Sequence, residues 1–389
     1  MRIGIGISKA SGTVAAPPSK SYAHRLLIVA DLYCGRCGVE GIALSDDISR
    51  TLECLKALEN RDATVTLPCG ESGSTLRFMV PIALALGGDF IFRCSPRLRE
   101  RGIAGYDTMF REQGISFSPV AEGFRIAGKL DQGTYRIDVS SSSQYLTGLL
   151  LALPMLEGTS RIITEGKLES AAYIDITLDV LRRAGILIAA ESDGFTVTGP
   201  QRGTVLPGGF RVEGDWSNAA FLEGFNLIGG DITLTGLNPD SCQGDRRYRE
   251  YFKALSDGFA RIDIAEQIDL GPVLFALAAL LHGAEFTGTR RLAIKESDRA
   301  EAMLRELAKF GVRSRRENNS VTIYGSQLHS PSEPLEGHND HRIVMALCLL
   351  LSRFGGCIDG AEAVKKSFPD YFDVIEKLGI KIERYADQR

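Results

Sequence analysis

The stretch SYAHRLLIVADLYCG at residues 21–35 combines a polar start, an apolar run of helical length and a closing glycine. A polar start of this kind caps a helix, and a glycine at the far end supplies the left-handed residue on which helices commonly terminate. The combination recurs in five further stretches, which are STLRFMVPIALALGG (74–88), SQYLTGLLLALPMLEG (143–158), SNAAFLEGFNLIGG (217–230), DLGPVLFALAALLHG (269–283) and DHRIVMALCLLLSRFG (340–355). The sequence therefore predicts six largely apolar helices.

The spacing of these helices also repeats. Their closing glycines are Gly35, Gly87, Gly158, Gly229, Gly283 and Gly355, which are 52, 71, 71, 54 and 72 residues apart. The short-then-long pattern of the first three helices returns in the last three, as expected for a triplicated unit that has been duplicated once. We therefore predict an α/β protein in which each half contains three copies of one module.

Short alternating runs between the helices predict strands, and amphipathic runs predict a second set of helices. The strands are expected at 3–7, 124–128, 161–164, 195–199, 231–236 and 321–325, and the second helices at 47–60, 174–185 and 299–311. This order makes each module a βαββαβ unit. The first strand precedes the first repeat, so it is free to complete a sheet of the other half, and the repeat count places a boundary near residues 213–215.

Composition limits the functions that the chain can have. With 389 residues it is too long for one ordinary core and suits two domains. A net charge of −4 without a dominant basic stripe argues against nucleic acid as the main partner. The apolar stretches are too short to span a bilayer, and the start MRIGIGISKASGT lacks the apolar core of a secretory signal. We expect a cytoplasmic protein that does not bind membranes.

The eight cysteines are scattered and are interpreted as reduced thiols. Cys34 and Cys37 form a single CxxC, but no second CxxC or histidine pair completes a zinc site. We therefore predict no metal site.

Several of the polar helix starts carry cations. In PPSKSYAHR (17–25), Lys20 and Arg25 lie on the first turns of a predicted helix, where they oppose the helix dipole unless an anion binds. The alternative is a solvated basic helix start. The next start, CGESGSTLR (69–77), resembles a phosphate cradle but lacks P-loop spacing, and a simple capping box also explains it.

Other clusters are compatible with small anions or with a solvated surface. Arg97, Arg99 and Arg101 alternate in SPRLRER (95–101), which is interpreted as an extended segment with all three arginines on one side. In the second half, IKESDR (294–299), HNDHR (338–342) and VKKSFPDYF (364–372) combine cations with carboxylates. Their recurrence at corresponding repeat positions favours ligand binding over surface ion pairs. The fourth helix start, GDWSN, carries no cation and is interpreted as structural.

The motifs occur together in one order over the whole chain. They are SKSYAHR, SDD (45–47), ESGSTLR, PRLRER, SSQYLT, AYIDITL, GDWSNAAF, KESDR, NDHR and KSFPDYF. This series resembles the 5-enolpyruvylshikimate-3-phosphate synthase family of the shikimate pathway. The resemblance implies an inside-out α/β barrel in each of two domains, with three βαββαβ units around a pseudo-threefold axis. It assigns residues 14–213 to the N-terminal domain and residues 1–13 with 214–389 to the C-terminal domain, with the active site in the cleft between them.

The implied reaction transfers the enolpyruvyl group of phosphoenolpyruvate to the 5-hydroxyl of shikimate 3-phosphate and releases phosphate. It proceeds by addition and elimination through a tetrahedral intermediate, in a monomer, without a metal or organic cofactor. The resemblance assigns Asp269 as the base for the 5-hydroxyl, and Glu296 with Lys20 to proton transfer at the methylene carbon. The implied contacts of shikimate 3-phosphate are Lys20, Ser21, Arg25, Ser142, Ser143, Gln144, Ser170, Tyr173, Asp269 and Lys295. Those of phosphoenolpyruvate are Lys20, Gly73, Arg97, Gln144, Arg299, His341, Arg342 and Lys366.

Two alternatives remain open at this stage. A UDP-N-acetylglucosamine enolpyruvyl transferase shares the fold, but that family uses a loop cysteine after its arginine motif, and this chain has no cysteine between Cys94 and Cys242. A non-catalytic anion-binding protein of the same fold is the other alternative. Two departures from the family are noted: Ala171 and Ala172 replace a common Lys-Pro pair, and Arg291 stands where some members carry an asparagine that touches substrate.

Overall fold

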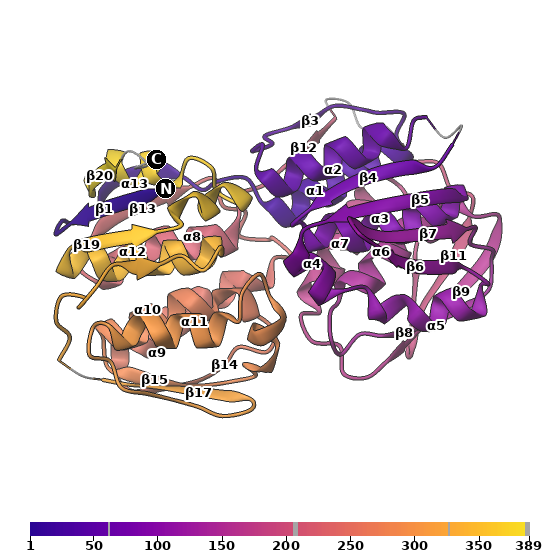
Figure 1. The fold of residues 1–389 in the computed structure, drawn as a ribbon. Coiled ribbons are helices and arrows are strands. Elements are labelled where there is room, and N and C mark those ends of the chain that lie inside the picture. The colour runs from indigo at the N-terminus through magenta and orange to yellow at the C-terminus, as the bar shows by residue number, and fades with distance from the viewer. Residues whose placement is uncertain (61–62, 205–208, 326, 386–389) are drawn as a thin grey trace. The chain divides into compact units, whose positions relative to one another are not determined.

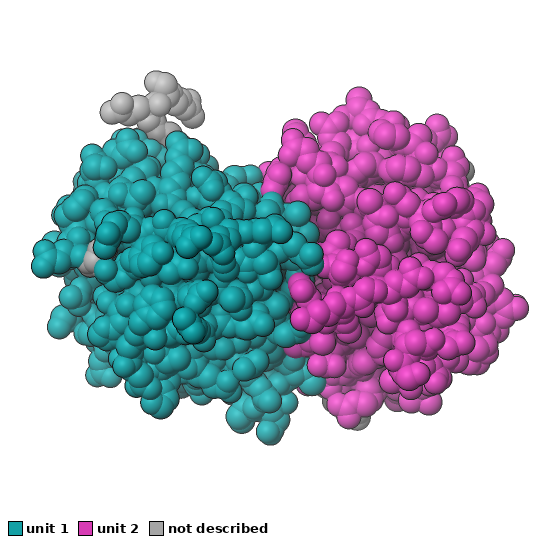
Figure 2. Space-filling view, turned by 90° about the horizontal axis from the view of Figure 1, so that it is seen from below, with its two compact units in different colours: residues 1–19, 214–389 teal, residues 20–213 magenta. Residues whose placement is uncertain are grey.

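A computed structural model describes residues 1–389 except 61–62, 205–208, 326 and 386–389. The chain divides into two compact units (Figure 2): unit 1 contains residues 1–19 and 214–389, and unit 2 contains residues 20–213. The first crossover follows Ser19, at the end of the range 13–19 that the resemblance implies, so residues 14–19 belong to unit 1 and not to the N-terminal domain to which they were assigned. The difference arises because strand β2 (Ser11–Ala15) pairs in parallel with strand β13 (Asp231–Thr235) of unit 1.

Unit 2 contains seven α-helices and ten strands among its described residues. The helices are α1 (Lys20–Leu32), α2 (Asp46–Ala57), α3 (Gly73–Leu86), α4 (Pro96–Arg101), α5 (Asp107–Glu112), α6 (Gln144–Ala152) and α7 (Ala172–Arg183). The strands are β3 (Val39–Glu40), β4 (Val65–Gly70), β5 (Gly88–Cys94), β6 (Ser116–Val120), β7 (Gly123–Gly128), β8 (Thr134–Asp138), β9 (Gly158–Glu165), β10 (Ala189–Glu191), β11 (Gly194–Gly199) and β12 (Phe210–Arg211).

Unit 1 contains β1 (Arg2–Gly6), β2, β13 and a second series of helices and strands. The helices are α8 (Trp216–Leu227), α9 (Tyr248–Asp257), α10 (Gly271–Leu280), α11 (Arg299–Ala308), α12 (His341–Phe354) and α13 (Tyr371–Lys377). The remaining strands are β14 (Ala260–Asp263), β15 (Gly283–Thr287), β16 (Ser314–Arg316), β17 (Ser320–Tyr324), β18 (Leu335–Glu336), β19 (Gly356–Asp359) and β20 (Lys381–Tyr385).

The two units share one sheet plan. Each has two four-stranded sheets and one parallel pair, with the orders β4-β5-β7-β6, β10-β11-β9-β8 and β12-β3 in unit 2 and β14-β15-β17-β16, β18-β19-β1-β20 and β13-β2 in unit 1. Every four-stranded sheet contains one parallel pair at an edge and two antiparallel pairs. In one of them the N-terminal strand β1 lies between β19 and β20, with Ile3 opposite both Ile358 and Arg384. The predicted repeat of mixed α/β modules is confirmed.

The most apolar helices lie inside the units with sheets outside them, as the unit 1 helices α10 and α12 illustrate in Figure 1. Twelve of the fourteen residues of α3, and twelve of fourteen in α12, are buried. A helix that is apolar all round must be covered on all sides, whereas strands such as β14 alternate between buried and exposed residues. The polar ends of the central helices are therefore the places where functional groups gather.

The six predicted closing glycines have positive φ angles, but only Gly87 and Gly355 directly cap their helices, and Gly158 and Gly283 begin strands β9 and β15. These angles are 59° at Gly35, 74° at Gly87, 89° at Gly158, 93° at Gly229, 79° at Gly283 and 70° at Gly355. A residue with a side chain is strained in this region, so glycine at these positions is a requirement of the repeat. Within the described ranges no helix combines the length and apolar character needed to cross a bilayer. All eight cysteines are free thiols.

Candidate active site

In unit 2 the start of α1 carries the first cation of the site. The Lys20 Nζ atom lies 2.8 Å from Asp47 Oδ2, at the start of α2, and both side chains are mostly buried. Asp47 lies in the SDD motif and was not predicted as a site residue. An enclosed ion pair of this kind limits the rotamers of the lysine side chain, so Lys20 is held in place by α2.

One turn later, Arg25 points into the helix bundle. Its Nε atom donates to Thr177 Oγ1 at 2.8 Å, and its Nη atoms donate to the carbonyl oxygens of Ser21 and Tyr173 at 2.8 and 3.1 Å. The guanidinium lies 5.1 Å from the ring centre of Phe78, and burial lowers the pKa of Arg25 to about 10. Within the described structure these partners are neutral, so the positive charge of Arg25 is available to an anion.

Gly73 is the first residue of α3 and lies close to the guanidinium groups of Arg77 and Arg101. A Cβ atom at this residue would lie 2.8 Å from Arg77 Nη1 and 3.1 Å from Arg101 Nη2, so glycine permits a close approach of guanidinium groups to the helix start. Arg77 Nη1 in turn donates to Gln144 Oε1 at 2.8 Å, and Gln144 Nε2 donates to Ser74 Oγ at 3.0 Å. Arg77 was not predicted as a site residue, although it lies in the quoted motif ESGSTLR.

The serine-rich segment and the start of α7 complete the unit 2 group. Ser142 Oγ accepts a hydrogen bond from the Gln144 amide at 3.2 Å, and Ser143 is buried beside it. Ser170 is buried with φ of 62°, an uncommon conformation for a residue with a side chain. Its carbonyl accepts from the Tyr173 amide at 3.1 Å, so the turn that opens α7 also presents the Tyr173 carbonyl to Arg25.

The arginine segment differs from its prediction. Residues Pro96–Arg101 form helix α4, not an extended segment. Ser95 Oγ accepts the Leu98 amide at 3.2 Å, Pro96 stands at the first helical position and Leu98 is buried, which together favour a helix. Positions two apart on a helix do not share a face, so Arg99 diverges from Arg97 and Arg101, which are four residues apart and lie on one face. Arg97 is partly exposed, with Nη1 3.3 Å from Glu100 Oε2.

In unit 1 the carboxylate of Asp269 is held by three cations. Its Oδ1 atom lies 2.6 Å from Arg299 Nη1 and 3.0 Å from Lys295 Nζ, and its Oδ2 atom lies 3.4 Å from Arg342 Nη2. Burial acts to raise the pKa of Asp269, but the charges of Lys295, Arg342 and Arg299 outweigh it and hold that pKa well below its usual value. Burial likewise lowers the pKa of Lys295, partly offset by Asp269.

Arg299 is the hub of this cluster and is 1% exposed. Besides Asp269, it contacts Glu296 Oε2 at 2.7 Å and Asp340 Oδ2 at 2.8 Å. Burial alone would lower the pKa of Arg299, but the charges of Asp340, Glu296 and Asp269 raise it above its ordinary value. Arg299 is therefore permanently charged, and it fixes the positions of the proposed base and of Glu296.

The start of α12 and the 3₁₀ helix Ala361–Lys366 carry the remaining predicted residues. Asp340 caps the helix by accepting the Arg342 amide at 2.9 Å, and His341 is 2% exposed, with Nδ1 3.9 Å from Asp340 Oδ1. Lys366 Nζ donates to the Asn339 carbonyl at 2.6 Å. The structure thus brings together Asp269, Lys295, Glu296, Arg299 and Arg342. His341 is the first residue of α12, and Lys366 is bonded to the segment that precedes this helix.

Ser217 is a further residue that the sequence analysis did not assign. It lies in the GDWSN start of α8, which was interpreted as structural, yet its Oγ atom accepts from Arg342 Nη1 at 2.6 Å. Arg291, left out of the predicted set, is buried and donates to the Ala265 carbonyl. The signal that could have pointed to Ser217 is the repeat itself, since the other helix starts carry site residues.

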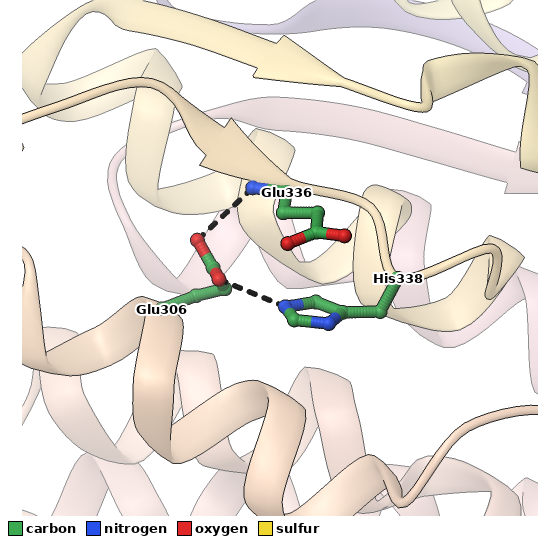
Figure 3. A group of neighbouring side chains, drawn as sticks. All are labelled: Glu306, Glu336 and His338. Carbon is green, nitrogen blue, oxygen red and sulfur yellow. Dashed lines mark hydrogen bonds and ion pairs between the residues drawn. The ribbon is translucent and has the colours of Figure 1, made fainter.

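One group of possible metal ligands lies in the described part of the chain and is formed by Glu306, Glu336 and His338 (Figure 3). The Glu306 carboxylate already accepts from the Glu336 amide at 3.0 Å and from His338 Nε2 at 2.8 Å. Lys309 Nζ also lies 2.9 Å from Glu306 Oε2. With a lysine and two donors in place, the carboxylate is satisfied without an ion, and the group acts as a brace between α11 and the loop before α12.

Comparison with solved structures defines the class of fold. The structure of EPSP synthase from Acinetobacter baumannii matches with a TM-score of 0.76 at 20% sequence identity, covering 98% of this chain and 99% of that one. The enolpyruvyl transferase NikO from Streptomyces tendae matches with a TM-score of 0.72 at 16% identity, covering 98% of each chain. The fold is that of the enolpyruvyl transferases.

Sequence comparison narrows this class. Relatives described as 3-phosphoshikimate 1-carboxyvinyltransferase include those of Clostridium kluyveri, at 36% identity over 99% of both chains, and Clostridioides difficile, at 34% over 97% of both. The chain belongs to the EPSP synthase (3-phosphoshikimate 1-carboxyvinyltransferase) family, whose model matches residues 5–375. It is an enzyme of aromatic amino acid biosynthesis that transfers an enolpyruvyl group from phosphoenolpyruvate to shikimate 3-phosphate. The two alternatives left open by the sequence are set aside by these matches.

Proposed function

We propose that the chain performs this transfer with Asp269 as the base that accepts the proton of the 5-hydroxyl. The observation that carries the proposal is the contact of this one carboxylate with Lys295, Arg299 and Arg342. A carboxylate so surrounded stays ionised at neutral pH and is fixed in orientation, as a base requires.

The substrates are proposed to be held by the cations and hydroxyls of both units. Phosphoenolpyruvate and shikimate 3-phosphate together bring two phosphates and two carboxylates, which demand several charged donors. For shikimate 3-phosphate the proposed contacts are Lys20, Ser21, Arg25, Ser142, Ser143, Gln144, Ser170, Tyr173, Asp269 and Lys295. For phosphoenolpyruvate they are Lys20, Gly73, Arg97, Gln144, Arg299, His341, Arg342 and Lys366.

The proposed chemistry is an addition followed by an elimination. The 5-hydroxyl oxygen attacks C2 of phosphoenolpyruvate as its proton passes to Asp269, while C3 receives a proton from the groups proposed for this step, Glu296 with Lys20. In the resulting tetrahedral intermediate, the bond from C2 to the phosphate oxygen then breaks, and C3 returns its proton to restore the double bond. The proton first taken by Asp269 leaves with the phosphate, so the enzyme is regenerated.

Substrate binding is proposed to make Asp269 a better base. Before binding, the neighbouring cations lower its pKa. When substrate phosphate and carboxylate groups pair with Arg342 and Lys295, the positive potential at Asp269 weakens and its proton affinity rises. Base strength is therefore proposed to be greatest once both substrates are present.

Three further properties are part of the proposal. The enzyme is proposed to act as a monomer, the state that the family resemblance implies. It needs neither a metal nor an organic cofactor, because lysine and arginine supply the charge that the leaving phosphate requires. It works in the cytoplasm, where its eight free thiols remain reduced.

A phosphate-release assay with alternative acceptors tests the proposed reaction. Phosphoenolpyruvate is supplied with shikimate 3-phosphate or with UDP-N-acetylglucosamine at equal concentrations. We expect phosphate release with shikimate 3-phosphate alone, with one phosphate formed per acceptor consumed. Release with UDP-N-acetylglucosamine, or release that does not depend on either acceptor, would contradict the proposed function.

A further inference from the structure

A buried carboxylate lies behind the site in unit 1 and has no role in the chemistry described above. Asp245 belongs to the single turn Gly244–Arg247 that precedes α9, and it is 5% exposed. Burial of an ionisable group is costly unless hydrogen bonds or opposite charges compensate it. The contacts of Asp245 therefore indicate what the buried carboxylate does.

Asp245 reaches Arg342 through a serine hydroxyl. The Asp245 carboxylate is hydrogen-bonded to the side chain of Ser217, and Ser217 Oγ accepts from Arg342 Nη1 at 2.6 Å. Because an arginine only donates, the single hydroxyl proton of Ser217 is left for the carboxylate. The result is a directed chain from the guanidinium through the hydroxyl to Asp245.

Arg342 is thus oriented by two carboxylates on different elements. Its Nη1 atom is tied through Ser217 to Asp245, and its Nη2 atom lies 3.4 Å from Asp269 Oδ2. Its guanidinium carbon lies 5.9 Å from the ring centre of Phe221 on α8. Two directed bonds at separate nitrogens restrict the rotation of the planar group.

The segment that carries Asp245 is itself anchored to the start of α8. Gln243 Oε1 accepts from the Trp216 amide at 3.0 Å and from Ser19 Oγ at 3.2 Å. Gln243 Nε2 donates to the Gly214 carbonyl at 2.8 Å. These bonds fix the position of the carboxylate relative to Ser217.

We infer that Asp245 is a positioning residue that acts through the Ser217 hydroxyl to aim the Arg342 guanidinium at phosphoenolpyruvate. The inference rests on the proposed role of Arg342 in binding that substrate. It adds a residue pair that orients the anion-binding group without touching the substrate. Asp245 and Ser217 are then expected to affect phosphoenolpyruvate and not shikimate 3-phosphate.

The arrangement also predicts a pH dependence. Burial, followed by the negative charge of Asp269, raises the pKa of Asp245 to about 6, while Arg342 and Ser217 act in the opposite direction. The charged or titratable groups that interact electrostatically with Asp245 include Asp269, Asp215, Arg342 and Tyr251. Below that pH the carboxyl becomes neutral and accepts less strongly, so Arg342 is held less firmly.

Steady-state kinetics of Asp245→Asn test the inference. At about pH 7.5 we expect KM for phosphoenolpyruvate to rise about three- to tenfold, the size of one weakened charge-assisted hydrogen bond, with kcat and KM for shikimate 3-phosphate within about twofold. Near pH 5.5 the ratio of variant to wild-type KM should fall toward one, because the wild-type carboxyl is then neutral. The substrate phosphate titrates in the same range but cancels in this ratio.

Matched variants separate the inference from its assumptions. Asp240→Asn changes an exposed aspartate in the loop before Asp245 and should leave the KM values unchanged. Ser217→Ala should raise the same KM, and the double variant with Asp245→Asn should be no worse than the more impaired single variant. Trp216 fluorescence verifies folding of unit 1.

Each outcome has a distinct meaning. An unchanged KM in Asp245→Asn, a ratio that does not vary with pH, or additive effects of the two substitutions would overturn the positioning role. Arg342→Gln tests the assumption independently. If Arg342→Gln leaves KM for phosphoenolpyruvate unchanged, the proposed role of Arg342 in binding this substrate is wrong. If Arg342→Gln raises this KM and Asp245→Asn does not, the role of Arg342 stands and only the positioning role of Asp245 is wrong.

Discussion

Replacing Arg299 with methionine provides a severe test of the cluster around the proposed base. Arg299 is 1% exposed and lies within 2.8 Å of an oxygen in each of Asp269, Glu296 and Asp340. Methionine keeps much of the side-chain volume but removes the charge, which leaves three carboxylates close together. Stranding buried partners of an ion pair costs about 3–5 kcal/mol of unfolding free energy.

The loss can be followed with a single intrinsic probe. The chain has one tryptophan, Trp216, which is buried at the start of α8 in unit 1. Urea unfolding monitored by its fluorescence therefore reports the unit that contains the cluster. Arg305→Met on the same helix is the control, since Arg305 is exposed and its replacement is expected to change stability by less than about 0.5 kcal/mol.

The pH dependence distinguishes electrostatics from packing. In the wild type, the depressed pKa of Asp269 contributes stability above its unfolded value, and this contribution is lost as the pH falls toward the folded value. In Arg299→Met the stranded carboxylates instead bind protons in the folded state, so the variant gains relative to the wild type between about pH 7 and pH 4. A loss no larger than that of Arg305→Met, or a deficit that stays constant with pH, would refute the reasoning.

Two further substitutions test the unit 2 group. Gly73→Ala places a methyl group 2.8 Å from Arg77 Nη1, so the methyl group or the guanidinium must shift. We expect KM for phosphoenolpyruvate to rise about tenfold with thermal stability nearly unchanged. An unchanged KM would show that phosphoenolpyruvate binding does not depend on the close contact between Gly73 and Arg77. Asp47→Asn removes the charged partner of Lys20 and should lower kcat/KM about tenfold in steady-state assays. Asp46→Asn, at the neighbouring exposed position, is the control and should leave kcat/KM unchanged. Equal effects of the two substitutions would argue against a role for the ion pair between Lys20 and Asp47.

Much of the fold could be predicted from the sequence because its signals are local. Each central helix is a run of apolar residues followed by a glycine, and the six glycines do adopt positive φ. The N-terminal strand was left without a defined sheet, since its pairing with β19 and β20 joins opposite ends of the chain. Helix α4 was missed because alternating arginines resemble a strand, although Ser95 and Pro96 carried the opposing signal.

The site could be predicted only as a set of charged motifs and a family resemblance. The contacts that organise it join residues distant in sequence, such as Arg342 with Ser217, 125 residues apart, and with Asp269, 73 residues apart. The helical and strand periodicities of a sequence do not predict contacts between residues so far apart. Asp340 and Asp47 both lie in the quoted motifs. Their ion pairs with Arg299 and Lys20 could not be predicted from the sequence, because each pair joins the starts of two different helices. The individual substrate contacts stay predictions.

The central claim is that Asp269, held by three cations, is the base of the transfer. The direct measurement is single-turnover phosphate release by Asp269→Asn at saturating phosphoenolpyruvate and shikimate 3-phosphate, with the binding of each substrate measured in parallel. We predict a rate about 10²–10⁴-fold below wild type, the usual contribution of a positioned base, with substrate affinities changed by less than about tenfold. Phosphate release at the wild-type rate would contradict the claim.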